Sequence, residues 1–215
     1  MNLRWLAFLA ALLGAGLTLA SAGSTLEGSG GAGQARGGPE RDPKKLRPGV
    51  FLYAVPEMGD PNFAETVVLL VSHDKAGAMG FVVNRPTRVP LRELLKAVPE
   101  AEKSELRFHW GGPVQPEAVH ALVRTNWPSE SARRVLDDVY VTGDVADVRE
   151  ALGRPDAPAK VKLFTGYAGW GRGQLEIEVR AGAWILEPAD ARSVFATDDL
   201  DLWERVYEIL ERLVA

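Results

Sequence analysis

Runs of aliphatic residues in the first part of the chain's body predict paired β-strands. Residues 49–55 form an apolar segment, and residues 66–71 form a continuous β-branched and aliphatic run, as expected for a strand buried on both faces. A short polar connection containing glycine, residues 73–78, leads to a further apolar run at 79–83. A connection of this composition favours an antiparallel hairpin between the two runs.

Later segments alternate between strand-like and helix-like patterns. Further strands are predicted at 106–110, 118–124, 139–142 and 161–164, and helices at 91–98 and 145–152. The helix at 91–98 places Leu91, Leu94, Leu95 and Val98 on one face. This order of elements predicts a mixed α/β domain.

The last helix has the clearest amphipathic pattern. Asp198, Asp199 and Asp201 stand where the positive end of the helix dipole favours anions. An apolar stripe follows at helical spacing, formed by Trp203, Val206, Tyr207, Leu210 and Leu213. We expect this stripe to pack against the core.

The first 22 residues have the features of a secretory signal peptide. Arg4 supplies the positive start, residues 5–20 are uncharged and apolar, and Ala20-Ser21-Ala22 fits the small-residue cleavage pattern. Cleavage would leave Gly23 first in an exported, periplasmic or extracellular protein. An uncleaved membrane anchor is an alternative, although the apolar run is shorter than the roughly 20 residues that a bilayer core requires. A mis-assigned start, which would leave the protein cytoplasmic, is a second alternative.

Residues 23–47 are predicted to be a flexible tether, and residues 48–215 a single folded domain. The tether is rich in glycine, serine and charge and has no apolar periodicity. The tether is predicted to be a spacer. Alternatively, it makes a weak contact to anionic lipid headgroups through Arg41, Lys44, Lys45 and Arg47. Apart from this contact, the protein would bind a membrane only through residues 1–22, if they are not cleaved.

The net charge of −4 is distributed unevenly between these parts. Residues 1–47 carry six Lys and Arg against three Asp and Glu. The body, residues 48–215, therefore carries nineteen Lys and Arg against twenty-six Asp and Glu, a net charge of −7. Nucleic-acid binding depends on Lys and Arg that neutralise phosphates, and Arg133-Arg134 is the only adjacent basic pair of the body. Nucleic acid is therefore disfavoured as a partner.

Few residues are candidates for catalysis. The absence of cysteine excludes disulfides, thiolate metal sites and a cysteine nucleophile. Ser72-His73-Asp74 resembles a hydrolase triad in letters, but neighbours on a strand point to opposite faces of the sheet. His73, His109 and His120 lack metal-ligand spacing, although the last two could approach each other across a hairpin at the turn 111–113. We predict no catalytic residues, no metal and no cofactor.

The glycine-rich segment 166–176 follows a strand and is predicted to open a helix. Backbone N–H groups at such a place can hold an anion. The segment matches no nucleotide-binding pattern, and Glu176 and Glu178 would repel a phosphate. The alternative is a tight strand-to-helix turn that uses glycine for its positive φ.

Four stretches of the body together resemble the YqgE/AlgH family of bacterial proteins. They read PEMGDPNFAETVVLLVSHDKAGAMGFVVNRP, WGGPVQPEAVHAL, FTGYAGWGRGQLEIEVRAGAWI and DLW, in the order and spacing of the family, from about Gly49 to the C-terminus. The family's motif positions correspond to Pro56, Asp60, Pro61, Asn84, Arg85, Pro86, Gly111, Gly112, Pro113, Gly166, Gly169, Trp170, Gln174, Leu175, Glu176 and Trp184.

This resemblance implies a single α/β domain with a bifurcated, partly barrel-like mixed sheet flanked by helices. It implies no enzymatic activity, and some members are labelled transcriptional regulators of alginate synthesis. Two features depart from the family: most members lack a signal-like segment and tether, and Ala121-Leu122-Val123-Arg124 stands where relatives often carry a histidine after the GGPV strand.

Three functional hypotheses follow. The first is a non-enzymatic binding or regulatory module with a protein partner or small ligand, whose contact surface comprises Asn84, Arg85, Gly111, Gly112, Trp170 and Gln174. The second is a small-ligand protein or enzyme with a pocket near Asn84, Arg85 and Glu176 or Glu178, in which Arg85 orients an anionic substrate. The third is a transcriptional regulator, which export from the cytoplasm would nearly exclude.

Overall fold

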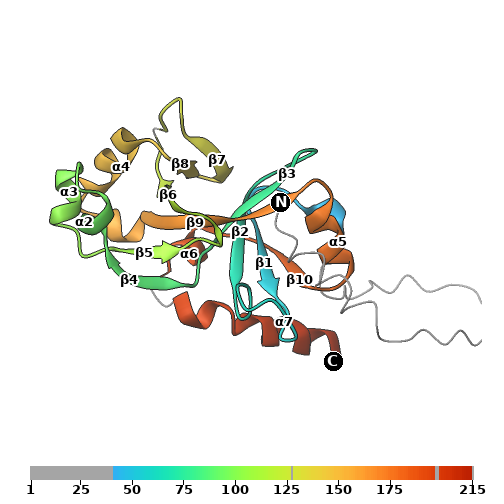
Figure 1. Ribbon diagram of the computed structural model, residues 1–215. Helices are drawn as coiled ribbons and strands as arrows, with labels where there is room; N and C mark the ends of the chain where they lie inside the picture. The colour runs from blue at the N-terminus through green and yellow to red at the C-terminus, as the bar shows by residue number, and fades with distance from the viewer. Residues whose placement is uncertain (1–40, 127, 197–198, 215) are drawn as a thin grey trace, which may run out of the picture. The chain divides into compact units, whose positions relative to one another are not determined.

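The computed structural model describes residues 41–126, 128–196 and 199–214, so residues 1–22 and most of the predicted tether lie outside the described residues. The elements are η2 (Pro43–Lys45), β1 (Val50–Ala54), β2 (Val67–Asp74), β3 (Gly77–Val82), β4 (Pro86–Pro90), α2 (Leu91–Leu94), α3 (Pro99–Glu102), β5 (Arg107–Trp110), β6 (Val114–Arg124), β7 (Arg133–Leu136), β8 (Val139–Thr142), α4 (Val145–Leu152), η3 (Ala157–Ala159), β9 (Val161–Gly171), α5 (Gln174–Arg180), β10 (Trp184–Pro188), α6 (Ala191–Val194), η4 (Asp199–Leu202) and α7 (Arg205–Val214). Helices α2, α3 and α4 gather beside β5, β6 and β8, whereas α5 and α7 lie near β1 and β10 (Figure 1). The mixed α/β fold predicted from the sequence is confirmed.

The sheet is mixed and forks along β9. Its strand order is β10-β1-β2-β3-β9-β6-β8-β7, and β5 pairs with both β4 and β9. The long strand β9 pairs with β5 over 163–165, in parallel, and with β3 over 168–171, antiparallel. Two branches of the curled sheet therefore leave one strand, which is the bifurcated arrangement that the family resemblance implied. The predicted β2–β3 hairpin is also present.

Glycines allow the backbones to approach each other at this fork. A Cβ atom on Gly111 would lie 2.4 Å from the carbonyl oxygen of Gly166, and one on Gly112, whose φ is +149°, would lie 2.2 Å from the carbonyl carbon of Tyr167. The N–H of Val82 donates to the carbonyl of Gly111, and the N–H of Gly111 donates to that of Thr165, both at 2.9 Å. The prediction that Gly111 and Gly112 form a contact surface is therefore wrong, because both are buried within the sheet.

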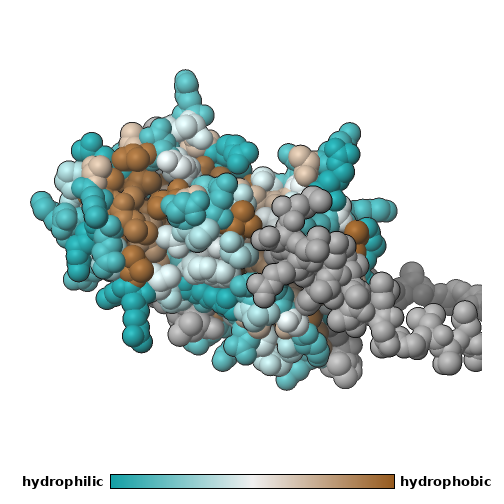
Figure 2. Space-filling model, in the orientation of Figure 1, coloured by the Kyte–Doolittle hydropathy of each residue, from teal (hydrophilic) through white to brown (hydrophobic). Residues whose placement is uncertain are grey.

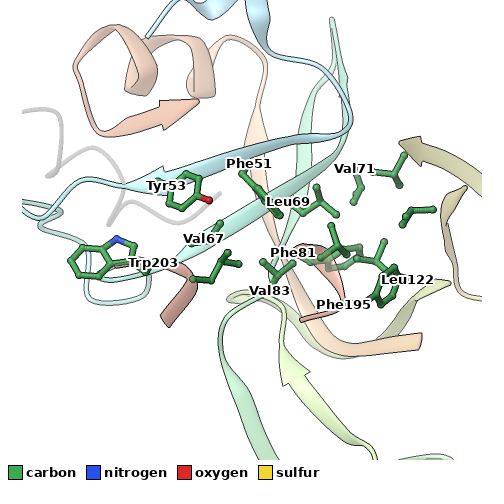
Figure 3. Packing of buried hydrophobic residues seen from close by; sticks show 14 of the residues in the cluster. Phe51, Tyr53, Val67, Leu69, Val71, Phe81, Val83, Leu122, Phe195 and Trp203 are labelled. Atoms are coloured by element: carbon green, nitrogen blue, oxygen red, sulfur yellow. The ribbon is translucent and has the colours of Figure 1, made fainter. Parts of the chain in front are cut away.

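Hydrophobic side chains pack on both faces of the sheet and beneath its second branch. One cluster lies between the sheet and the C-terminal segment; in Figure 3, Tyr53 and Trp203 stand at one end of it, and Phe81, Leu122 and Phe195 at the other. A second cluster packs under α5 and includes Trp170 and Trp184. A third cluster joins α2, α3 and α4 to β5, β6 and β9.

Two predictions of local structure need correction. Strand β9 continues through the glycine-rich segment as far as Gly171, because β3 pairs with this part of it, and α5 begins only after Gly173. The helix predicted at 91–98 ends after one turn, at Leu94, where Leu95 has left the helical region with φ −99° and ψ +47°, and Leu94 is 50% exposed instead of facing the core. By contrast, α4 spans the predicted residues 145–152.

The C-terminal helix α7 begins later than the aspartates suggested. Asp199 and Asp201 lie in the preceding 3₁₀ turn η4, and Asp198 and the side chain of Leu213 lie outside the described part. Trp203 and Val206 are buried as predicted, but Tyr207 is 50% exposed and Ile209 is buried in its stead. The turn at residues 203–204, between η4 and α7, breaks a single helical periodicity and changes which positions face the sheet.

The folded body begins before residue 48. The side chain of Asp42 accepts a hydrogen bond from the N–H of Lys44 at the start of η2, and Leu46 is buried in the cluster under α5. This part of the segment predicted as a tether is therefore packed on the domain. No helix in the described ranges is long and apolar enough to cross a membrane.

Candidate functional site

Asn84 follows β3 and holds the end of the loop before β2. Its side-chain oxygen accepts a hydrogen bond from the N–H of Val67 at 2.9 Å, and its amide nitrogen donates to the carbonyl of Glu65 at 2.9 Å. The residue is only 4% exposed. Both ends of its side chain therefore join β3 to the loop, and a buried amide with these partners is satisfied by the backbone.

Arg85 completes the same arrangement. Its guanidinium donates to the carbonyls of Asn62 and Ala64, both at 2.8 Å, and its Cζ lies 5.1 Å from the centre of the Trp110 ring. Burial lowers the pKa of Arg85, and the nearby Glu65 and Asp60 carboxylates act in the opposite direction. The side chain orders the loop at 62–65 through backbone carbonyls.

These hydrogen bonds hold Glu65 in an unusual backbone conformation. Its φ is +55°, in the left-handed region that residues with a Cβ adopt at a cost. The carbonyl of Glu65 is bound by Asn84, while its side chain is exposed. The loop therefore directs the Glu65 carbonyl toward the protein and leaves the carboxylate accessible to solvent.

Beside this loop lies an open hollow with a water-accessible volume of about 680 Å³. One wall consists of Ala64, Glu65, Asn84 and Arg85, and the other of Trp203, Glu204, Tyr207 and Glu208. The Tyr207 and Trp203 rings form an edge-to-face pair with centroids 5.4 Å apart, and the Trp203 indole donates to the carbonyl of Ala54 at 2.8 Å. The hollow therefore combines a half-exposed aromatic ring with carboxylates.

A second polar cluster, centred on Glu178, holds α5 to the sheet. The Oε2 atom of Glu178 accepts hydrogen bonds from the indole N–H of Trp170 at 2.9 Å and of Trp184 at 2.8 Å, and Oε1 accepts one from Gln174 at 3.0 Å. Phe63 packs on both tryptophan rings. Since Trp170 is 5% exposed, it belongs to the core.

Glu176 belongs to neither of these arrangements. Its Oε1 lies 3.0 Å from Nε2 of His73, which joins the first turn of α5 to β2. His73 therefore has a partner on α5, and the letters Ser72-His73-Asp74 lie along a strand, as the rejection of a triad expected. The proposed pocket shared by Arg85 and Glu176 is not formed, because the hollow at Arg85 is lined by Glu65, Glu204 and Glu208.

The remaining histidines lie on the two sides of β9. His109 of β5 and His120 of β6 are both paired in register with Phe164, so the prediction that they meet across a hairpin is wrong. His120 packs on Phe81 and Tyr167, and its buried Nε2 has no hydrogen-bond partner among the described residues. Burial lowers the pKa of His120. No cluster of three or more His, Asp or Glu residues suited to a metal ion occurs in the described ranges.

The glycine-rich segment does not form an anion site. Gly166 and Gly169 lie inside β9, and α5 carries Glu176 in its first turn. The side-chain oxygen of Gln174 already accepts the N–H of Gly171 at 3.1 Å. The alternative given above, a tight turn with positive φ at glycine, describes Gly173, whose φ is +71°.

The described part of the chain also carries two recesses of different size from the hollow. One lies across α7, has about 640 Å³ of water-accessible volume, and is lined by Phe51, Tyr53, Glu187, Pro188, Asp190, Arg205, Glu208, Ile209 and Glu211. The other, between α4 and β8, offers only about 30 Å³. This is space for a few water molecules and not for a metabolite.

The sequence-based site residues therefore separate into three groups. Asn84 and Arg85 support one wall of the hollow, Trp170, Gln174 and Glu176 hold α5, and Gly111 and Gly112 form the fork. Sequence reasoning missed Glu65, Glu204 and Tyr207 as lining residues. The spacing of Trp203 and Tyr207 suggested a buried stripe, and no local pattern marks the left-handed Glu65.

Comparisons with known proteins agree with this fold. The AlgH-like family model matches residues 51–213. A UPF0301 protein of Pseudomonas aeruginosa is 38% identical over 168 residues, covering 76% of this chain and 86% of that protein, and one of Rhizobium meliloti is 34% identical over 173 residues, covering 75% and 85%.

Solved structures give the same result. The solution structure of the AlgH protein from Pseudomonas aeruginosa is 35% identical, with a TM-score of 0.60, over 77% of this chain and 88% of that one. A protein from Corynebacterium diphtheriae shares the fold at 22% identity and a TM-score of 0.66, over 78% of this chain and 92% of that one.

On the face drawn in Figure 2, hydrophilic residues predominate, and hydrophobic surface gathers toward the end that carries α2 to α4.

Proposed function

The chain belongs to the AlgH-like family, and we propose that its domain is a non-enzymatic binding module. Its binding site in this proposal is the hollow between α7 and the loop at 62–65. The partner is a macromolecule or ligand that contacts Tyr207 and Glu65.

One observation carries this proposal. The polar groups of Asn84 and Arg85 bind the backbone of residues 62–65 and hold Glu65 at a positive φ on the wall of an open hollow. A left-handed non-glycine residue costs of order 1 kcal/mol, and such residues gather at functional sites. The arrangement therefore holds an exposed carboxylate on the wall of the hollow at a cost in backbone conformational energy.

The aromatic wall gives independent support. Tyr207 is 50% exposed although it lies beside the buried Trp203, and large aromatic side chains at open hollows are typical of binding sites. The imidazole and carboxylates considered earlier for chemistry have other partners, His73 with Glu176, and Glu178 with two indoles. These contacts favour binding over catalysis at the hollow.

The proposal is tested by ligand screening against three proteins. Wild type, Tyr207→Ala and the control Ile177→Ala, which removes a 44% exposed side chain from α5, are screened for thermal stabilisation by peptide and metabolite sets. We expect a ligand that stabilises wild type and Ile177→Ala but not Tyr207→Ala. If every ligand stabilises all three proteins equally, or none stabilises the wild type, the proposal is overturned.

Glu65→Gly separates binding from folding. Glycine adopts positive φ without strain, so this variant is expected to keep its stability or gain up to about 1 kcal/mol in the free energy of unfolding, while the ligand found above binds more weakly. A variant that loses stability and retains full binding would contradict a binding role for Glu65.

A further inference from the structure

We propose that the occupant of the hollow is a lysine- or arginine-rich segment of another polypeptide, which extends from the hollow across α7 into the neighbouring groove. This inference rests on the proposed function and specifies the chemistry of its partner. Helix α7 forms the shared wall, since Glu208 lines both recesses. A small compact ligand would occupy one recess, whereas a chain segment can follow both.

The charge of these two recesses favours a cationic partner. Their walls carry the carboxylates of Glu65, Glu187, Asp190, Glu204, Glu208 and Glu211 and the guanidinium groups of Arg85 and Arg205. The body as a whole carries a net charge of −7. A wall with excess negative charge attracts a basic segment and disfavours phosphates and acidic peptides.

The two guanidinium groups offset this charge only in part, because six carboxylates stand against two guanidinium groups on these walls. Arg85 donates to two backbone carbonyls and stacks over Trp110. Arg205 donates to the hydroxyl of Ser193 at 3.2 Å and acts on the phenol of Tyr53, a buried residue. Both guanidinium groups thus have contacts within the protein, and Arg205 is exposed, as are Glu65 and Glu204.

The aromatic ring of Tyr207 adds a contact that charge alone does not provide. Its half-exposed ring lines the hollow together with Glu204 and Glu208. Ammonium and guanidinium groups bind the faces of aromatic rings in addition to carboxylates. A lysine or arginine side chain entering the hollow would therefore meet both kinds of group, which distinguishes this surface from other exposed carboxylates of the protein.

The experiment measures binding of a short fluorescein-labelled peptide of alternating lysine and glycine to the full chain by fluorescence anisotropy. Titrations are made at low ionic strength and at about 0.15 M salt, where charges are screened beyond roughly 8 Å. The site variant is Glu65→Gln with Glu204→Gln. The control is Glu102→Gln with Glu130→Gln, which changes the charge equally at exposed positions elsewhere. Circular dichroism verifies that each variant is folded.

We expect the site variant to weaken binding about five-fold and the control by less than about two-fold, since exposed ion pairs act only at short range. Tyr207→Ala should weaken binding about two- to five-fold, the range of a cation–π contact. Equal losses in both double variants, or no binding of the peptide, would overturn the inference. So would spermine binding that is as tight as the peptide's and equally sensitive to the site variant, because that would assign the site to a small polycation.

Failure of this inference can be distinguished from failure of the proposed function. If a neutral or acidic ligand from the thermal screen depends on Tyr207 while the lysine peptide does not bind, the hollow is a binding site of other specificity. If neither the peptide nor any screened ligand depends on Tyr207, both proposals are wrong.

Discussion

Replacement of Glu178 by leucine tests the role of the tryptophan-rich motif as a packing device. In the native structure one carboxylate oxygen accepts both indole N–H groups, of Trp170 and Trp184, which are 5% and 1% exposed. Leucine has a similar size and no acceptor. Each buried N–H left without a partner costs about 1–3 kcal/mol, so the two together should lower the free energy of unfolding by about 2–6 kcal/mol.

The assay is urea-induced unfolding at 25 °C, followed by far-ultraviolet circular dichroism. The matched control is Glu178→Gln, whose amide oxygen can still accept from both indoles, so its loss of stability should be less than half that of the leucine variant. A leucine variant within about 0.5 kcal/mol of wild type would refute the reasoning, because surface substitutions without structural roles fall in that range. Equal losses in both variants would show that the negative charge, and not the hydrogen bonds, is required.

Further variants test the fork and the buried titratable groups. Gly111→Ala should lower the free energy of unfolding by well over about 2 kcal/mol, since its Cβ would lie 2.4 Å from a carbonyl oxygen. Gly173→Ala, whose Cβ would have no atom within 4 Å, should lower it by about 1 kcal/mol because of its positive φ alone. Equal midpoints of urea unfolding for the two variants would contradict this. Burial lowers the pKa of His120, so as the pH decreases below 6.5 the unfolded chain takes up a proton that the folded protein does not. The stability of the protein should therefore fall below pH 6.5. In thermal unfolding measured as a function of pH, His120→Gln should show a weaker fall. Burial raises the pKa of Tyr53 to about 12 from 10.0, so the phenol ionises first in the unfolded chain. The free energy of unfolding should therefore fall by up to about 2–3 kcal/mol between pH 10 and pH 12. Tyr53→Phe should lack this loss, and a phenol that titrates at its usual pH in the folded protein would disprove the assignment.

The site could be recognised from the sequence only in part. Asn84 and Arg85 were identified as candidates and do lie at the hollow, but they act on the loop backbone and do not themselves form the exposed surface. Glu65 and Tyr207 provide that surface. The conformation of Glu65 depends on hydrogen bonds from residues about twenty positions away, so no local pattern could reveal it.

The sequence by itself determined the elements whose stability is local. The apolar runs of β1 and β2, the turn that closes the β2–β3 hairpin, and the amphipathic period of α4 all lie where the pattern placed them. Hydrophobic alternation and turn chemistry act over a few residues, and they are written in consecutive letters. The order of the motifs was likewise sufficient to identify the family resemblance.

Only the tertiary structure decided how distant segments meet. Strand β9 extends through three glycines because β3 and β6 pair with it, and Trp170 is a core residue because Glu178 and Phe63 pack on it. Tyr207 is exposed because a turn separates η4 from α7. Such outcomes depend on contacts between residues far apart in the chain, whose energies exceed local propensity, and it is these contacts that create the hollow.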